Sequence, residues 1–184
     1  MTEEIIIAGF GGQGVLSMGK ILAYSGIMQE QEVSWMPSYG PEMRGGTANV
    51  TVILSDDRVS SPVLQSYDTA VLLNQQSVDK FESMVKRGGL LIYDPNGIIR
   101  HPDRDDIRIF QVEATKEAVR LKSAITFNMV VLGAYIKIKP IVEYDNVIRG
   151  LKKSLPERHH HLIPANEEAI RRGMQIVKEA KIKA

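Results

Sequence analysis

Short runs of β-branched and other apolar residues alternate along the 184-residue chain with longer stretches in which apolar residues recur at helical spacing. This alternation of strand and helix patterns is typical of an α/β fold. The pattern predicts strands at residues 5–7, 32–36, 47–54, 69–73 and 90–93, and a last strand at 107–112. It predicts a first helix that begins at residue 15 and ends near 29–31, and later helices at 78–85, 115–121, 127–138, 142–151 and 165–182.

One predicted pair of strands has no helix between its members. Residues 55–58 form a turn signal, and the apolar segment 59–63 follows the strand at 47–54 directly. Strands joined by so short a connection pair antiparallel, and Pro62 restricts the second strand to an edge of the sheet. We therefore expect a mixed sheet.

Three polar or flexible positions mark the ends of predicted elements. The pair Gly88-Gly89 is predicted to end the preceding helix, because glycine favours the left-handed conformation that closes helices. Asp94 follows a buried strand and is predicted to start a turn rather than to contact a ligand. Asn128 stands at the start of the uniformly apolar helix and is expected to cap it rather than to reach a ligand.

The composition is that of an ordinary globular protein, with 43% hydrophobic and 24% charged residues. A formal net charge of +1 gives no general attraction to nucleic acid or to an acidic membrane. No apolar run approaches the roughly 20 residues that span a bilayer, and the N-terminus lacks the basic segment of a signal peptide. We therefore expect a cytoplasmic protein without a nucleic-acid or membrane partner.

The chain contains no cysteine, which excludes disulfides, thiolate nucleophiles and cysteine-ligated zinc or iron–sulfur clusters from this polypeptide. Its four histidines are His101 and the consecutive His159, His160 and His161. Consecutive residues on a helix are about 100° apart, so the three neighbours cannot all face one metal ion. The sequence therefore predicts no metal site, and any redox chemistry needs an organic cofactor or another subunit.

The first strand pattern ends in Gly9, Gly11 and Gly14, and a helical pattern follows at once. This spacing between a strand and a helix matches the dinucleotide-binding fingerprint, in which N–H groups at the helix N-terminus bind phosphate. The acidic residue that binds the ribose is missing, because the next strand ends in Met36-Pro37. The alternatives are an NAD(P) site, a turn that faces another phosphate or a partner protein, and a purely structural turn.

A loop at 37–46 is predicted to lie beside this glycine turn. It contains two prolines and three glycines, which argue against regular structure. Because ligands of open α/β sheets bind at the carboxyl ends of strands, the polar side chains of this loop are candidates for ligand binding. They are Ser38, Tyr39, Glu42 and Arg44.

The chain contains none of the full motifs Gly-x-Ser-x-Gly, His-Glu-x-x-His and Gly-x-x-x-x-Gly-Lys-Ser/Thr. The candidate site offers backbone N–H groups, one arginine, one glutamate, one tyrosine and one serine, but no nucleophile–base pair. Such a set can bind a phosphate or a carboxylate. The residues alone therefore indicate a binding module more than a self-sufficient enzyme, with no catalytic residue in this chain.

Two segments, taken together, resemble a known family. They are Gly9-Phe10-Gly11-Gly12-Gln13-Gly14-Val15 and Ser38-Tyr39-Gly40-Pro41-Glu42-Met43-Arg44-Gly45-Gly46. On these motifs the chain resembles, over nearly its whole length, the gamma subunit of 2-oxoacid:ferredoxin oxidoreductases. Later positions that fit are Leu91-Ile92-Tyr93-Asp94, Asn128, Leu132-Gly133-Ala134, Asn166 and Gly173. The resemblance implies a single α/β domain at residues 1–184, with a three-layer α/β/α Rossmann-like arrangement around a mixed, mostly parallel sheet.

The resemblance also implies a place in a complex that oxidatively decarboxylates a 2-oxoacid, forms an acyl-CoA and reduces ferredoxin. Thiamine diphosphate, magnesium and iron–sulfur clusters are then expected in other subunits, which agrees with the absence of cysteine here. The expected partners are the alpha, beta and delta subunits, and ferredoxin through the complex. The chain length and the Ser-Tyr-Gly-Pro-Glu segment favour 2-oxoglutarate over pyruvate and branched-chain 2-oxoacids.

For individual residues, the resemblance implies a role in assembly and in CoA binding. Backbone N–H groups of the glycine turn would meet a phosphate of CoA or a carboxylate of a partner, with Arg44 as the charged contact. Tyr39 and Met43 would supply apolar contacts at a subunit interface. The turn residues concerned are Gly9, Gly11, Gly12, Gln13 and Gly14. The competing hypotheses are a free-standing NAD(P)-binding oxidoreductase of Rossmann type and a scaffold whose turn binds nothing.

Overall fold

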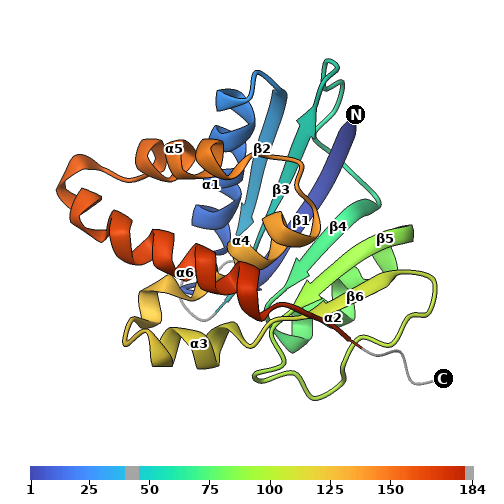
Figure 1. Cartoon of the computed structure of the whole chain (residues 1–184). Helices are drawn as coiled ribbons and strands as arrows, with labels where there is room; N and C mark the ends of the chain where they lie inside the picture. The colour runs from blue at the N-terminus through green and yellow to red at the C-terminus, as the bar shows by residue number, and fades with distance from the viewer. Residues whose placement is uncertain (40–45, 181–184) are drawn as a thin grey trace.

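A mixed sheet of seven strands forms the centre of the structure, a computed structural model that describes residues 1–39 and 46–180 (Figure 1). The strands lie side by side in the order β2-β3-β1-β4-β5-β6-β7. They are β1 (Thr2–Phe10), β2 (Glu32–Tyr39), β3 (Thr47–Ser55), β4 (Tyr67–Leu72), β5 (Val85–Tyr93), β6 (Arg108–Gln111) and β7 (Lys178–Glu179).

Most of the strands point in the same direction. β1, β2, β4, β5 and β6 run one way, and β3 and β7 run the other way. The parallel neighbours are β1 with β4, β4 with β5, and β5 with β6. The prediction of an α/β fold with a mixed, mostly parallel sheet is therefore confirmed.

The strand β3 pairs differently from the prediction. Its antiparallel partners are β1 on one edge, where Ile7 lies opposite Val50, and β2 on the other, where Trp35 lies opposite Val52. No strand forms at 59–63, so the predicted hairpin is wrong. The physical reason is that both edges of β3 are occupied by strands that precede it in the sequence.

The outer strand β2 extends to Tyr39, beyond the predicted end at residue 36. Pro37 lies inside this strand and pairs opposite Val50. Proline is tolerated there because an outer strand pairs along one side only, so the missing N–H need not interrupt a ladder. The predicted loop therefore begins later than expected, and Ser38 and Tyr39 belong to the strand.

Helices cover both faces of the sheet, most of them on one face (Figure 1). One core joins Ile5 and Ile7 of β1 to the larger helical layer. This layer contains α1 (Val15–Met28), α3 (Ala114–Arg120), α4 (Phe127–Ile138), α5 (Tyr144–Ser154) and α6 (Ile163–Ile176). Ile6 and Ala8 point to the opposite face and pack with α2 (Gln75–Phe81), since alternate residues of a strand face opposite sides. The three-layer α/β/α arrangement is confirmed.

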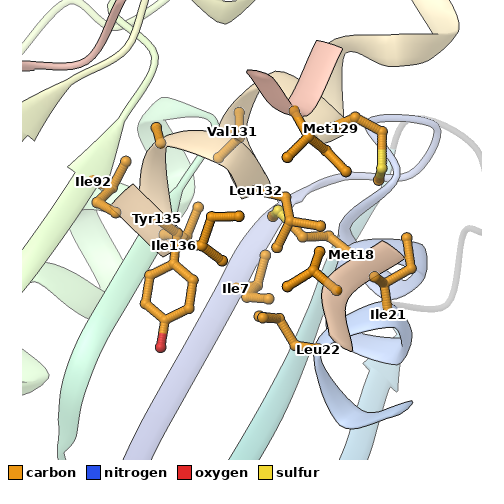
Figure 2. Packing of buried hydrophobic residues seen from close by; sticks show 14 of the residues in the cluster. Ile7, Met18, Ile21, Leu22, Ile92, Met129, Val131, Leu132, Tyr135 and Ile136 are labelled. Atoms are coloured by element: carbon orange, nitrogen blue, oxygen red, sulfur yellow. The ribbon is translucent and has the colours of Figure 1, made fainter. Parts of the chain in front are cut away.

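Helix α4 is buried on nearly all sides, as its uniformly apolar sequence predicted, and its bounds are those predicted. Tyr135 of α4 lies in the same apolar cluster as Ile7 of β1 and Met18 of α1 (Figure 2). On its other side α4 packs against α6, where Gly133 lies against the backbone of Ile170. None of the helices in the described part of the chain is long and apolar enough to cross a bilayer.

The pair Gly88-Gly89 does not end a helix. The preceding helical segment finishes with the 3-10 turn Glu82–Met84, and β5 begins at Val85, so both glycines lie within the strand. Gly88 has a φ of +77°, and the pairing of β5 with β4 is irregular in this region. The glycines therefore accommodate an irregularity in the strand. Glycine suits this position for the same reason that it suits a helix end, because it adopts a positive φ without strain.

The last helix is shorter than predicted. α6 ends at Ile176, whereas the helical pattern continued to residue 182, which lies outside the described residues. After α6 the chain adds β7 to the edge of β6, and the N–H of Ala180 donates to the carbonyl of Ile109 (2.8 Å). The strand predicted at 107–112 is therefore not the last one.

Candidate functional site

Glycines shape the turn between β1 and α1. Gly12 and Gly14 have φ angles of +101° and +72°, a region that other residues rarely adopt. The N–H of Gly11 donates to the carbonyl of Gly46 (2.9 Å), which ties the turn to the segment that enters β3. The predicted glycine turn is therefore present between a strand and a helix.

The side chain of Gln13 anchors this turn. Its Oε1 accepts the N–H of Phe10 (2.6 Å), and its Nε2 donates to the carbonyl of Leu73, just after β4 (3.1 Å). Gly9 leaves room for this contact, because a Cβ at that position would lie 2.5 Å from Oε1 of Gln13. The sequence indicated a backbone role for Gln13, and its side-chain role was missed.

Asn128 holds the turn from the side of α4. Its Nδ2 donates to the carbonyl of Gly14 (3.2 Å), across 114 positions of sequence. Thr126 occupies the N-cap position of α4, so the predicted capping role of Asn128 is wrong. The helical pattern placed Asn128 in the first turn of α4, but no local signal could reveal so distant a partner.

The N-terminus of α1 presents unpaired backbone donors. Gly14 occupies the N-cap position and provides no side-chain cap. Among the residues that the structure describes, the N–H groups of Val15, Leu16 and Ser17 donate to no acceptor. Because a helix N-terminus also carries partial positive charge, this position suits an anion such as a phosphate or a carboxylate.

A cavity of about 390 Å³ lies against this helix N-terminus. Tyr39 at the end of β2 and Ala48 in β3 line it together with the glycine turn. The structure therefore places Tyr39 beside the turn, as expected from the meeting of strand ends at one edge of the sheet. Tyr39 is 56% exposed and Phe10 is 37% exposed, so the cavity has an aromatic rim that a ligand or partner can reach.

The other residues predicted around Tyr39 are not part of this arrangement. Ser38 precedes Tyr39 in the same strand, so the two side chains point to opposite faces of the sheet, and Ser38 does not line the cavity. Glu42, Met43 and Arg44 lie outside the described residues. The charged contact expected from Arg44 stays a prediction.

A second cavity, of about 240 Å³, also borders Gly12. Its walls come from α3, the segment after α3 and the start of α4, and they include Thr115, Val119 and Phe127. In the described part of the chain, no charged side chain lines either cavity. The positive end of α1 is therefore the electrostatic feature that these residues offer to a ligand.

Asp94 fixes the start of α3 next to the second cavity. Its Oδ1 accepts the N–H of Asn96 (3.0 Å), as in an Asx turn, which confirms the predicted turn role. Its Oδ2 accepts both the N–H and the hydroxyl of Thr115 (2.8 and 2.6 Å). The buried carboxylate therefore acts within the fold, and its acceptor sites are used there.

An ion pair between a buried carboxylate and a half-buried arginine joins α3 to α6. Nε of Arg172 donates to Oε1 of Glu117 (2.7 Å), and Glu117 is only 3% exposed. This hydrogen bond lowers the pKa of the Glu117 carboxyl, against the opposing effect of burial. The pair holds in place the helix that forms one wall of the second cavity.

The geometry of a dinucleotide site is incomplete in this chain. In dinucleotide-binding folds, the strand after the first helix lies directly beside the first strand and ends in the carboxylate that binds the ribose. Here the antiparallel β3 separates β2 from β1, and β2 ends in Tyr39. Gly14 and Lys20 have the spacing of a Walker loop, but the stretch between them is helix α1, and Ile21 stands where that motif needs Ser or Thr.

The consecutive histidines lie in a 3-10 helix, Glu157–Leu162. A ring nitrogen of His160 lies 3.0 Å from the carbonyl oxygen of Leu155, and one of His161 lies 3.0 Å from that of Arg158. Within residues 1–39 and 46–180, no three His, Cys, Asp or Glu side chains are grouped to hold a metal ion. Both rings therefore contact carbonyl groups only three to five residues earlier in the chain.

Similarity to known proteins extends over nearly the whole chain. Residues 4–176 match the family described as pyruvate ferredoxin/flavodoxin oxidoreductase. The 2-oxoglutarate synthase subunit KorC of Methanothermobacter marburgensis is 33% identical over 98% of this chain and 100% of its own length. The ketoisovalerate oxidoreductase subunit VorA of the same organism is 39% identical over 73% of this chain. The matching region makes up only 28% of that longer protein. A crystal structure of a keto/oxoacid ferredoxin oxidoreductase gamma subunit from Geobacter sulfurreducens PCA superposes with a TM-score of 0.83, at 26% identity and 96% coverage of both chains.

Proposed function

The chain belongs to the pyruvate ferredoxin/flavodoxin oxidoreductase family, and on this premise we propose that it is the gamma subunit of a multi-subunit 2-oxoacid:ferredoxin oxidoreductase. The complex oxidatively decarboxylates a 2-oxoacid, transfers the acyl group to CoA and passes the electrons to ferredoxin. This chain assembles with the alpha, beta and delta subunits. Thiamine diphosphate, magnesium and iron–sulfur clusters belong to those subunits, in keeping with a chain that has no cysteine.

The proposed 2-oxoacid is 2-oxoglutarate. The relative named for 2-oxoglutarate synthase aligns with this chain from end to end, at 98% of this chain and 100% of its own length. The relative named for ketoisovalerate contains the matching region as a segment of a longer protein. The match to the relative named for 2-oxoglutarate covers 98% of this chain, against 73% for the relative named for ketoisovalerate, and this supports 2-oxoglutarate over the branched-chain substrate.

The proposed contribution of this chain to the reaction is a contact with CoA. The observation that carries it is the uncapped N-terminus of α1, which borders a cavity lined by Tyr39. The phosphates of CoA are anions that free backbone donors and the helix dipole favour. The turn presents no nucleophile–base pair in the described residues, so the chain binds and orients rather than reacts.

The experiment is purification of the tagged chain from its native host, with the eluate assayed for dye reduction that depends on both a 2-oxoacid and CoA. We expect larger, cysteine-containing subunits that bind thiamine diphosphate to co-elute. We also expect higher activity with 2-oxoglutarate than with pyruvate or 2-ketoisovalerate. Reactions without CoA and without a 2-oxoacid are the controls.

Each outcome of this purification bears on a different part of the proposal. Activity with another 2-oxoacid would correct the substrate and leave the subunit role intact. Co-elution and activity without any dependence on CoA would contradict the CoA contact. A chain that elutes alone, without activity, and binds NAD(P)H tightly would replace the subunit role by that of a free-standing NAD(P)-binding oxidoreductase.

A further inference from the structure

The carboxyl ends of β1 and β4 form the switch point of this sheet. β1 leads into α1 on one face, and β4 leads into α2 on the opposite face. Connections that leave two adjacent parallel strands toward opposite faces open a crevice between the strand ends. Ligands of open α/β sheets bind in this crevice, so its contents decide where an anion can approach the glycine turn.

In this chain the side chain of Gln13 spans the crevice. It accepts the N–H of Phe10 at the end of β1 (2.6 Å) and donates to the carbonyl of Leu73 at the end of β4 (3.1 Å). The N–H of Leu73 is also used, because it donates to the carbonyl of Ala8 (2.9 Å). The N–H of Phe10 and both backbone groups of Leu73, at the ends of the two strands, are therefore already paired.

The free donors lie on another side of the turn. Asn128 holds the carbonyl of Gly14 from α4 (3.2 Å), and a Cβ at Gly14 would overlap the Asn128 side chain. With both Gln13 and Asn128 in place, the turn is fixed to β4 and to α4 at once. The unpaired N–H groups at the start of α1 then border the cavity that Tyr39 lines.

We infer that Gln13 is a positioning residue, which closes the crevice between β1 and β4 and directs an anionic ligand to the α1 N-terminus beside Tyr39. This inference rests on the proposed function, since the ligand is taken to be a phosphate of CoA. Gln13 acts through the backbone of the turn and not by contact with the reacting atoms. Its loss therefore weakens CoA binding without slowing the chemical step.

The chain contains a matched control for a substitution at Gln13. Gln29, at the C-terminal end of α1, makes the same kind of contact with two backbone groups. Its Nε2 donates to the carbonyl of Ile141 (2.9 Å), and its Oε1 accepts the N–H of Glu143 (2.7 Å). Gln29→Ala therefore removes similar hydrogen bonds at the opposite end of the same helix, away from the glycine turn.

The experiment compares Gln13→Ala with Gln29→Ala in the whole purified complex. We expect Gln13→Ala to raise the KM and the directly measured Kd for CoA by about tenfold, which corresponds to about 1.4 kcal/mol. We expect kcat at saturating CoA to stay within about twofold of the wild type. Gln29→Ala should leave both CoA constants within about twofold while it lowers the thermal stability by a comparable amount.

A result in which both variants change the CoA constants equally, or in which neither changes them, would overturn the positioning role. If Gln13→Ala does not assemble, Gln13→Met and Gln29→Met give the same comparison with the side-chain volume largely kept. Tyr39→Ala separates this inference from the proposed function. A raised Kd for CoA in Tyr39→Ala alone would leave the CoA contact standing and remove the role of Gln13, whereas no change in any variant would contradict the contact itself.

Discussion

For a single residue, Gly14 shows how tightly the neighbouring side chains fix the turn. Its φ is +72°, and a Cβ at this position would overlap the side chain of Asn128. Gly97 has a similar φ of +77°, but in the described part of the chain no atom beyond its two neighbouring residues lies within 4 Å of the place where its Cβ would be. A side chain at Gly97 would therefore cost only the left-handed backbone conformation, whereas a side chain at Gly14 would also overlap Asn128.

We expect Gly14→Ala to destabilise the chain more than Gly97→Ala. The left-handed conformation costs an L-residue about 1–2 kcal/mol, and this applies to both positions. Overlap with Asn128 adds about 1–3 kcal/mol at Gly14 only. The measurement is the free energy of unfolding from urea denaturation. Equal losses would mean that Asn128 moves aside without cost, and would contradict the fixed turn.

At the scale of elements, the packing of α4 on α6 depends on two glycines. A Cβ at Gly133 would overlap the carbonyl oxygen of Ile170, and a Cβ at Gly173 would overlap that of Val130. A backbone carbonyl inside a helix cannot rotate away as a side chain can. The two helices can therefore lie this close only while both positions lack a side chain.

Gly133→Ala should destabilise the chain by about 3 kcal/mol, since overpacking forces the helices apart. The expected sign is opposite to that of helix propensity, which favours alanine over glycine by about 1 kcal/mol. Thermal unfolding followed by circular dichroism measures the effect. Lys137→Ala, on the exposed side of α4, is the control and should change the stability by no more than about 0.5 kcal/mol. A stabilised Gly133→Ala variant would contradict the close packing.

At the scale of the whole molecule, buried carboxylates connect elements that are far apart in the sequence. Glu3 in β1 accepts a hydrogen bond from the hydroxyl of Thr69 in β4 (2.5 Å) and pairs with Lys139 after α4 (2.7 Å). The pair of Glu117 with Arg172 joins α3 to α6 in the same way. The pair of Glu117 with Arg172 makes the stability of the assembled layers depend on pH.

The pKa of Glu117 is lowered in the folded chain, chiefly by the hydrogen bond from Arg172. A lowered pKa means that the pair stabilises the fold above the ordinary glutamate pKa of 4.5, and that this contribution is lost as the pH falls through the lowered value. Glu117→Gln should therefore be less stable than the wild type at pH 7, with the difference shrinking as the pH falls below 4.5. Urea denaturation across this pH range measures it.

The control for this prediction is Glu113→Gln. Glu113 lies just before the same helix, and its pair with Lys116 is exposed on both sides. Exposed pairs contribute about 0–1 kcal/mol, so this variant should stay close to the wild type. A stability difference between wild type and Glu117→Gln that does not change with pH would contradict the role given to the ionised carboxylate.

Elements whose causes are local could be predicted from the sequence. The apolar run Ile5–Ile7, the glycines after it and the helix that follows depend on neighbouring residues only, and the strand, turn and helix are all confirmed. The bounds of α4 follow from its uniform apolarity in the same way. The motifs at 9–15 and 38–46 indicated the family, which the match over residues 4–176 confirms.

The pairing of the strands and the contacts of the glycine turn depend on how the whole chain folds. A period of two along a strand shows which side is buried, but every residue type offers nearly the same backbone groups to a neighbouring strand. The position of β3 between β1 and β2 could therefore not be predicted from the sequence. The contacts of Gln13 with Leu73 and of Asn128 with Gly14 join residues 60 and 114 positions apart, and they exist because the folded layers bring those residues together.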